Sequence, residues 1–428
     1  MDTKYELIKL KNGIKILYIP FPKSKLMYIE IKLLTGTINE TASTLEYGHI
    51  LEHMNAQFTS SKYPDAKENE RKVNMYGGYT NASTYSYFTK YYIKGPIKYS
   101  KYFIDLIINS YINFKLDKTI FETEKKAVVE ELNSDKNSIW NTLSEHIDKV
   151  LYKNHPYAKT LDESIKNTKL STIKNILNYR KKNYKTSNTI IIIAGDIKKS
   201  EVIKPLLFMK KTIYKVKLPG YKYKIQNPLV FINTNTNSTK IFLIFNMMPY
   251  TYFTMQADHV ILLKTILTDG LSSRLYSLRM KHGLIYSISS TCKFDYYNKE
   301  LNSFTIETET NSRNIPKVIN IILSELNSLK RNLISDNEFN TLKNNILTQK
   351  LEQKRNNNME DYVNRYSSTV LFGKKIQTYS DYFNQLNKIS RNKIKNLSNT
   401  IFNTKKLVIG YGGKVNHNNE IKQILLKW

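Results

Sequence analysis

The first residues of the chain alternate between polar and apolar positions, which is the pattern of a half-buried β-strand. Residues 5–34 predict a strand pair around an Asn12-Gly13 turn, followed by the strand-like segment MYIEIKLLTG. From about Tyr47 the apolar spacing becomes helical. The chain is therefore expected to begin with antiparallel strands that lead into a helix.

Strand and helix patterns continue through the first half. The segment YTNASTYSYFTKYYI, which follows a Gly77-Gly78 pair, predicts strand. Helical spacing is found over about 97–114 and 118–150. The apolar run TIIIIAGDI at 189–197 predicts a buried strand that closes this half.

The same order of elements returns after residue 228. PLVFINT and KIFLIFNMM predict strands, DHVILLKTIL predicts a helix, and GLIYSISSTCKF and NSFTIETET predict strands again. Helices over about 315–330 and 336–355 precede a closing strand, LVIGYGG. Such a repeat predicts an α+β chain of two structurally repeated α/β domains, each a mostly antiparallel sheet with helices packed on one face.

The domain boundaries are expected at a segment without periodicity. KVKLPGYKYKIQNP, at 215–228, combines prolines, a glycine and lysines and predicts a linker. An N-terminal domain would then occupy residues 1–214 and a C-terminal domain residues 229–428. The length of 428 residues agrees, because it exceeds what one ordinary core supports.

Composition indicates a folded protein of a reducing compartment. Hydrophobic residues make up 41% of the chain and aromatic residues 12%, well above the content of disordered chains. Cys292 is the single cysteine, so an intramolecular disulfide is impossible. The N-terminus has no secretory-signal pattern, and no stretch approaches the ~20 apolar residues that span a bilayer. We expect a soluble, intracellular protein, cytoplasmic in the first instance, with an organelle as the alternative.

The formal net charge of +30 raises the question of a nucleic-acid partner. The basic residues are spread along the whole chain together with many Asn, Ile and Tyr residues, a composition typical of an AT-rich coding sequence. No long basic block and no nucleic-acid motif accompanies them. We therefore expect no specific nucleic-acid site, and a basic nucleic-acid-binding protein is the least favoured of the alternatives.

The segment HILEH carries the candidate chemistry. His49 and His53 are four residues apart, so on a helix they share one face and can bind a single metal ion. Glu52 lies near the same face and is suited to act as a base. The competing interpretation is a helix whose histidines only pack or cap. We favour one Zn²⁺ per chain, because the histidine pair with an intervening glutamate is the motif of a zinc peptidase in inverted order.

A catalytic zinc also needs a third protein ligand. The helical segment FETEKKAVVEEL offers Glu124 and Glu131, which are seven residues apart and therefore on one face. Glu130 points about 100° away from Glu131. The aligned segment of the second half, FNTLKNNILTQ, has Leu342 and Gln349 in place of Glu124 and Glu131, so the second copy keeps the scaffold without the acids.

HILEH, YGGYTNAST and ETEKKAVVEE together resemble the pitrilysin, insulysin and mitochondrial processing peptidase family. The resemblance extends over nearly the whole chain. It implies Glu131 as the third zinc ligand, since 131 − 53 = 78 falls within the spacing of about 75 to 80 residues typical of the family. It implies Glu124 as a supporting acid that orients a histidine or the water, with Glu130 as the alternative ligand.

The resemblance also implies substrate-binding residues. Asn81 and Ala82 match the family's substrate strand, on whose edge an extended peptide lies. Arg279 and Tyr286 match an arginine and tyrosine pair that binds substrate and steadies the carbonyl oxygen. Two parts of the chain depart from the family pattern: the segment NAQFTS after the motif helix, where relatives have an apolar continuation that contains glycine, and Tyr87, where relatives often have glutamate.

Family members enclose substrate between two such two-domain units, each one half of a clamshell. This chain has both the zinc motif and the arginine and tyrosine pair, which predicts a homodimer, with a heterodimer of paralogues as the alternative. The remaining histidines are expected to be structural or surface residues: His146, His155, His259, His282 and His417.

The expected activity is that of a zinc endopeptidase acting on peptides or unfolded protein segments inside a closed chamber. Glu52 would take a proton from the zinc-bound water and pass it to the departing amine. The rival within the same fold is a catalytically inactive scaffold or core subunit.

Overall fold

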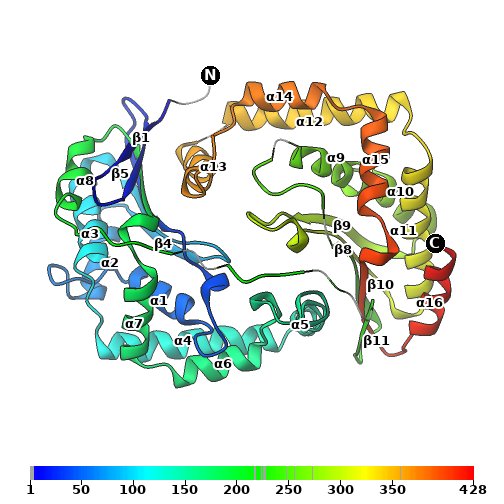
Figure 1. The fold of residues 1–428 in the computed structure, drawn as a ribbon, viewed down its shortest axis with the longest axis horizontal. Helices are drawn as coiled ribbons and strands as arrows, with labels where there is room; N and C mark the ends of the chain where they lie inside the picture. The colour runs from blue at the N-terminus through cyan, green and yellow to red at the C-terminus, as the bar shows by residue number, and fades with distance from the viewer. Residues whose placement is uncertain are drawn as a thin grey trace. The chain divides into compact units, whose positions relative to one another are not determined.

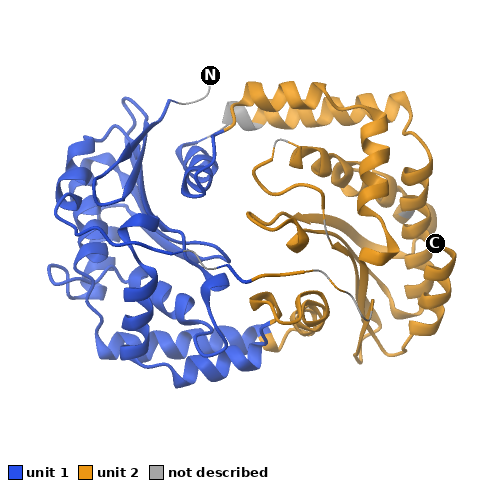
Figure 2. Cartoon of the chain, in the orientation of Figure 1, with its two compact units in different colours: residues 1–135, 159–219, 356–376 blue, residues 136–158, 220–355, 377–428 orange. Residues whose placement is uncertain are grey.

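The computed structural model describes residues 4–428, except 216–217, 223, 225–227, 247, 255, 272 and 357 and the side chains of 278 and 353–356. The chain forms two compact units (Figure 2). Unit 1 holds residues 1–135, 159–219 and 356–376, and unit 2 holds residues 136–158, 220–355 and 377–428. The chain passes from unit 1 to unit 2 inside the predicted linker 215–228, part of which lies outside the described residues.

Unit 1 contains a six-stranded sheet in the order β1-β2-β6-β3-β5-β4 (Figure 1). Its strands pair antiparallel except β2 with β6, which are parallel. The strands are β1 (Glu6–Lys9), β2 (Lys15–Pro20), β3 (Leu26–Leu33), β4 (Tyr79–Thr84), β5 (Thr89–Pro96) and β6 (Thr189–Gly195). Strand β4 is the edge strand on one side and pairs only with β5.

Both faces of this sheet are covered. Ile29 and Ile31 of β3 belong to the core that packs on helix α3 (Ser100–Ile112), as the alternation of side chains predicts. Lys32, on the opposite face, donates to Ser367 of helix α13 (Met359–Leu371), and Lys32 is also paired with Glu30. Helices α3 and α8 therefore lie on one side of the sheet and α13 on the other (Figure 1).

The helices of unit 1 include the predicted ones and several short ones that periodicity did not reveal. They are α1 (Tyr47–Ala56), α2 (Ala66–Met75), α3 (Ser100–Ile112), α4 (Lys118–Lys136), α6 (Leu161–Leu170), α7 (Ile173–Asn183), α8 (Lys199–Leu206) and α13 (Met359–Leu371). The prediction of one helix over 118–150 is wrong, because α4 ends at Lys136 and a new helix, α5 (Ile139–Tyr152), begins behind Ser138. The Ser138 side chain accepts from the Asn141 N–H and so caps α5.

Unit 2 repeats the sheet of unit 1 without its first strand. Its order is β7-β11-β8-β10-β9, and β7 with β11 is again the parallel pair. The strands are β7 (Leu229–Asn233), β8 (Ser238–Asn246), β9 (Ile285–Lys293), β10 (Ser303–Asn311) and β11 (Leu407–Gly413). The predicted α+β class with two repeated domains is confirmed.

The helices of unit 2 follow the order of unit 1 as well. They are α9 (Ala257–Thr268), α10 (Arg274–His282), α11 (Ile315–Arg331), α12 (Asp336–Asn356), α14 (Tyr379–Asn387), α15 (Arg391–Ile401) and α16 (Asn418–Lys427), together with α5. Leu342, the counterpart of Glu124, is buried in the core of this unit. Within the described part of the chain, no helix combines the length and apolarity needed to cross a membrane.

The two halves of the sequence exchange one helix. In each half the long helix, α4 or α12, is followed by a shorter one, α5 or α13. Helix α5 of the first half packs on β11 and β7 in unit 2, and α13 of the second half packs on β6, β3 and β2 in unit 1. Each helix thus covers the second face of the sheet built by the other half, an exchange that the predicted ranges 1–214 and 229–428 did not include.

Candidate metal centre

Helices α1 and α4 pack against each other through their apolar faces. Both contribute to one buried cluster, made of Tyr47, Ile50, Leu51, Met54, Phe121, Val128, Val129, Leu132, Ile165, Ile176 and Tyr179. The polar residues of the two helices are left at the rim of this cluster. His49 and His53 of α1 therefore face Glu124 and Glu131 of α4, which are more than 70 residues away in the sequence.

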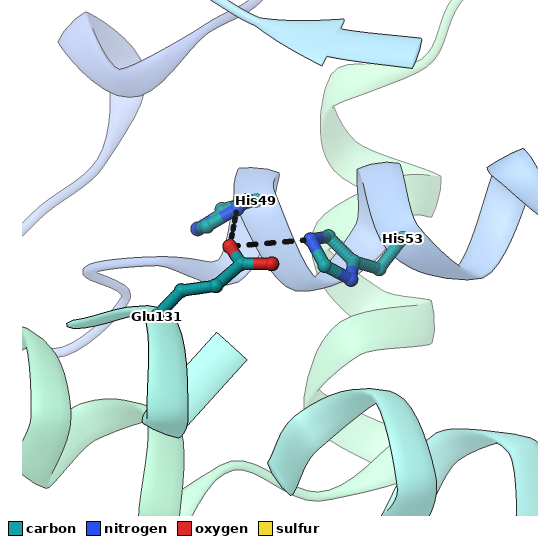
Figure 3. A group of neighbouring side chains, drawn as sticks. All are labelled: His49, His53 and Glu131. Carbon is teal, nitrogen blue, oxygen red and sulfur yellow. Dashed lines mark ion pairs between the residues drawn. The ribbon is translucent and has the colours of Figure 1, made fainter. Parts of the chain in front are cut away.

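Two imidazoles and one carboxylate converge at this rim (Figure 3). The Glu131 Oε2 atom lies 3.4 Å from His49 Nε2 and 3.7 Å from His53 Nε2. Ligands at ~2.0 to 2.1 Å from a tetrahedral zinc are about 3.3 Å apart, so these distances suit a shared ion better than a direct hydrogen bond. Among the described residues, His49, His53 and Glu131 are the group of three or more such side chains that could hold a metal.

Each imidazole also has a carboxylate at its second nitrogen. Glu124 Oε2 is 3.0 Å from His53 Nδ1, and Glu46 Oε2 is 3.1 Å from His49 Nδ1. Gln57 donates to the other oxygen of Glu124 at 2.9 Å. An imidazole that donates its Nδ1–H to a carboxylate presents the lone pair of Nε2, which is the form that binds a metal.

The charges at the site follow from this geometry. Burial alone would lower the pKa of His49, but the hydrogen bond with Glu46 and the charges of Glu46, Glu52 and Glu131 raise that pKa above its usual value. Burial would raise the pKa of Glu46, and the contacts with His49 and Lys159 instead lower it to about 2. Glu46 is therefore a carboxylate at neutral pH.

Glu52 is half-buried, and burial raises its pKa although the two imidazoles counteract the rise. The side chain and the backbone N–H of Thr84, the last residue of β4, also lower the pKa of Glu52, and the Thr84 hydroxyl donates to the Gly48 carbonyl of α1 at 3.4 Å. The candidate base is thus tied to the end of the edge strand. Glu130 is exposed and is not part of the metal-binding group.

Strand β4 presents one open edge beside this site. The Ala82 N–H donates to the Asn81 side-chain oxygen at 2.8 Å, and the Asn81 amide donates to the Tyr79 hydroxyl at 3.3 Å. Contacts between α1 and β4 bring the helix of the histidines next to this strand. An extended peptide could pair with the open edge in the manner of an added strand.

Arg279 and Tyr286 belong to unit 2, whereas the metal-binding group belongs to unit 1. Arg279 lies in the last turn of α10 and donates to the Tyr276 hydroxyl at 3.2 Å. Tyr286 lies in β9 and is 59% exposed. Tyr87, at the position that departs from the resemblance, is buried in unit 1.

The remaining histidines lie away from this metal-binding group. His155 and His259 are buried, and burial lowers the pKa of His155 to about 4. His146 Nδ1 donates to the Thr142 carbonyl one turn earlier in α5, and His417 pairs with Glu420. His282 ends α10.

Sequence reasoning missed three residues of the site: Glu46, Gln57 and Thr84. Glu46 and Gln57 each lie within four residues of a motif histidine, so helical spacing could have suggested them. Thr84 carried no such signal, because only the pairing of β4 with the rest of the sheet brings it to Glu52.

Two models of one peptidase family match adjoining parts of the chain. Residues 15–164 match the model described as Insulinase (Peptidase family M16). Residues 171–346 match the model described as the Peptidase M16 inactive domain. The second description agrees with the loss of the acidic residues in the second repeat, at Leu342 and Gln349.

Curated relatives carry peptidase names. An uncharacterized zinc protease, YmxG, of Bacillus subtilis is 22% identical over 92% of this chain and 94% of its own length. The β subunit of the mitochondrial-processing peptidase of Saccharomyces cerevisiae is 23% identical over 78% and 75%. The zinc protease PqqE of Helicobacter pylori is 28% identical over 46% of this chain and only 45% of its own length.

Solved structures share the fold. A protease from Helicobacter pylori superposes with a TM-score of 0.82 at 21% identity, covering 96% of this chain and 99% of the other. A chain of complex III from Candida albicans superposes with a TM-score of 0.78 at 13% identity, covering 98% and 99%. The two family models and these relatives together place the chain in the insulinase family, peptidase family M16, the family of the pitrilysins and mitochondrial processing peptidases.

Proposed function

We propose that the chain is a zinc-dependent endopeptidase that cleaves peptides or unfolded segments of proteins. The observation that carries the proposal is the convergence of His49 Nε2, His53 Nε2 and Glu131 Oε2, with a carboxylate at each Nδ1. Two neutral imidazoles, one carboxylate and an open position form the donor set of a catalytic zinc site. These residues would hold one Zn²⁺ per chain.

Bound zinc would lower the pKa of a coordinated water and polarise the scissile carbonyl. Glu52 would accept the proton of the attacking water and later deliver it to the departing amine. Its contacts with Thr84 hold the carboxylate at the end of β4. A peptide paired along the edge at Asn81 and Ala82 would therefore run towards the base.

Arg279 and Tyr286 are proposed to bind substrate and to donate to the carbonyl oxygen during attack. A homodimer would let each copy supply this pair to a neighbouring metal centre, and pairing with a paralogue is the alternative assembly. The processing-peptidase β subunit and the complex III chain, both named as parts of larger assemblies, support a partner subunit. An intracellular location, cytoplasmic or organellar, is part of the same proposal.

A second candidate is an inactive scaffold of the same fold. The likeness to a chain of complex III favours it. The retained set of His49, His53, Glu131 and Glu52 favours the peptidase, because a scaffold has no use for a metal site with a base beside it.

One experiment separates these candidates. Zinc content and cleavage of a quenched peptide library are measured for the wild type, Glu52→Gln and Glu130→Gln, with a chelator and with zinc added back. We expect one zinc per chain in all three proteins. Glu52→Gln should lose about 10²- to 10⁴-fold in cleavage rate, while Glu130→Gln, which removes the same charge from an exposed position of α4, keeps the wild-type rate. A wild type that binds zinc without cleaving any peptide would favour the scaffold.

A further inference from the structure

Glu46 occupies an unusual backbone position at the start of α1. It is the N-cap residue, with φ 67° in the left-handed region that favours glycine. Its side chain makes no capping hydrogen bond. The buried Glu40 serves that purpose instead, accepting from the Glu46 and Gly48 N–H groups at 3.1 and 2.9 Å. The usual reason for an acidic residue at a helix N-terminus therefore does not account for Glu46.

The two oxygens of Glu46 have separate partners. Oε1 accepts from Lys159 at 2.6 Å and from the Ser164 hydroxyl at 2.8 Å. Oε2 is left facing His49 Nδ1 at 3.1 Å. The side chain is only 5% exposed, so water does not compete for these contacts. Lys159 and Ser164 thus fix the carboxylate so that one oxygen points at the imidazole.

The arrangement matches the one at the other histidine. Glu124 directs Oε2 to His53 Nδ1, while Gln57 holds its Oε1. Glu124 reaches its histidine from α4, whereas Glu46 reaches His49 from the turn before α1. A salt bridge that only tied α6 to α1 would not need an oxygen aimed at a ligand ring.

We propose that Glu46, held by Lys159 and Ser164, is the positioning residue of His49: it accepts the Nδ1–H of the ring and keeps Nε2 free for the metal. The inference rests on the proposed zinc site and adds to it a residue that the family resemblance did not imply. It also makes α6 part of the metal centre, since Ser164 lies in that helix.

Glu46→Gln tests the proposal, because an amide has only one oxygen. It cannot accept from Lys159 and Ser164 on one atom and from the His49 Nδ1–H on the other. If its oxygen keeps Lys159 and Ser164, its NH₂ group faces Nδ1. Nδ1 must then be unprotonated to accept this hydrogen bond, and the proton of the neutral ring lies on Nε2. We expect zinc affinity, measured by competition with a chromophoric chelator, to fall about 10- to 100-fold. In ¹⁵N-histidine spectra of the metal-free protein, the His49 signals should shift to the Nε2–H tautomer.

Ser164→Ala is the milder second variant. It keeps the carboxylate and removes one donor to Oε1, so a smaller loss of affinity without a change of tautomer is expected. Glu130→Gln removes the same negative charge from an exposed position of α4 and should alter neither quantity.

The inference is overturned if Glu46→Gln lowers the unfolding temperature of the metal-free protein but leaves zinc affinity and the His49 tautomer unchanged. The same holds if Glu46→Gln does not fold and Ser164→Ala binds zinc as tightly as the wild type. A wild type that binds no zinc overturns the proposed function instead, so the two failures are distinguishable.

Discussion

At the scale of single residues, the candidate centre depends on side chains that hold other side chains. Glu124 and Glu46 each place a carboxylate oxygen at an imidazole Nδ1, and Thr84 lowers the pKa of Glu52. Such supporting contacts decide protonation states, because a carboxylate or hydroxyl in a half-buried site has few water molecules to compete with it. Substitutions of these residues should therefore change affinity or pH dependence before they change the fold.

Thr84→Val removes the hydroxyl that lowers the pKa of Glu52 and keeps the backbone N–H. We expect kcat/KM to fall about 5- to 10-fold, which corresponds to about 1 kcal/mol, the net size of one ordinary hydrogen bond. Because the Thr84 contacts lower the pKa of Glu52, the acid limb of the pH–rate profile should move to higher pH. Ser83→Ala, on the same strand, is the control. An unmoved acid limb would show that the hydroxyl does not act on the base.

Glu40 should give the stability of unit 1 a distinct pH dependence. Burial raises the pKa of Glu40 from 4.5 to about 7. Between these values the folded protein keeps a proton that the unfolded chain releases, so raising the pH from about 4.5 to 7 destabilises the fold. The shift corresponds to about 3 kcal/mol at about 1.4 kcal/mol per pKa unit. Denaturant unfolding of metal-free Glu40→Gln and wild type at pH 5 and pH 8 should show this loss in the wild type alone.

At the scale of elements, the break between α4 and α5 is the decisive feature. Helix α4 packs against α1 in unit 1 and brings Glu124 and Glu131 to the histidines. Helix α5 packs instead on the sheet of unit 2. There Ile147 and Leu143 pack against Gly410 of β11, where a side chain would collide: an added Cβ would lie 2.2 Å from Ile147 Cδ1. Because the contact is this close, we expect α5 to pack on this sheet in one position only.

Gly410→Ala should therefore destabilise the protein by about 1 to 3 kcal/mol through overpacking. Ile147→Ala removes both colliding atoms, Cδ1 and Cγ1, which lie 2.2 and 2.6 Å from the added Cβ, and should alone cost about 2 to 5 kcal/mol. In the double variant the new methyl group should occupy part of the space that Ile147 leaves, giving a coupling of at least about 1 kcal/mol by denaturant unfolding. Gly220→Ala, where nothing lies within 4 Å, is the neutral control. Additive effects would contradict the described packing of α5.

At the scale of the whole molecule, the two units have the same architecture but carry different candidate functional residues. Unit 1 carries the candidate metal site, whereas unit 2, whose long helix α12 lacks the acids, carries Arg279 on α10 and Tyr286 on β9. The basic residues that give the net charge of +30 are spread along the chain, and no nucleic-acid-binding motif accompanies them in either half of the sequence. A metal bound in unit 1 should consequently stabilise unit 1 first.

Zinc addition should slow hydrogen exchange in α1 and α4 and leave β8 and β10 unchanged. A ligand at 100 times its Kd adds about 2.7 kcal/mol to the stability of the state that binds it. Hydrogen exchange followed by mass spectrometry resolves the two units. Glu131→Gln should abolish the effect of zinc, and an equal effect in that variant would place the metal elsewhere.

The sequence by itself determined the class of fold and the repeat, and it predicted the three residues of the candidate metal site that the structure brings together. Strand and helix periodicities depend on local burial, and the repeat supplied two independent copies of each pattern. The two histidines of the HILEH motif are four residues apart on a helix and therefore share one face. Their closeness could be predicted without the tertiary structure. The acids of α4 were identified by spacing and by the resemblance.

Only the tertiary structure decided which helix belongs to which unit and which side chains support the ligands. The exchange of α5 and α13 follows from apolar faces that fit the opposite sheet, and no local pattern reports which of two similar sheets a helix will cover. Glu46, Lys159, Ser164 and Thr84 meet the site from separate segments. Contacts between distant segments arise from packing, which the order of residues along the chain does not display.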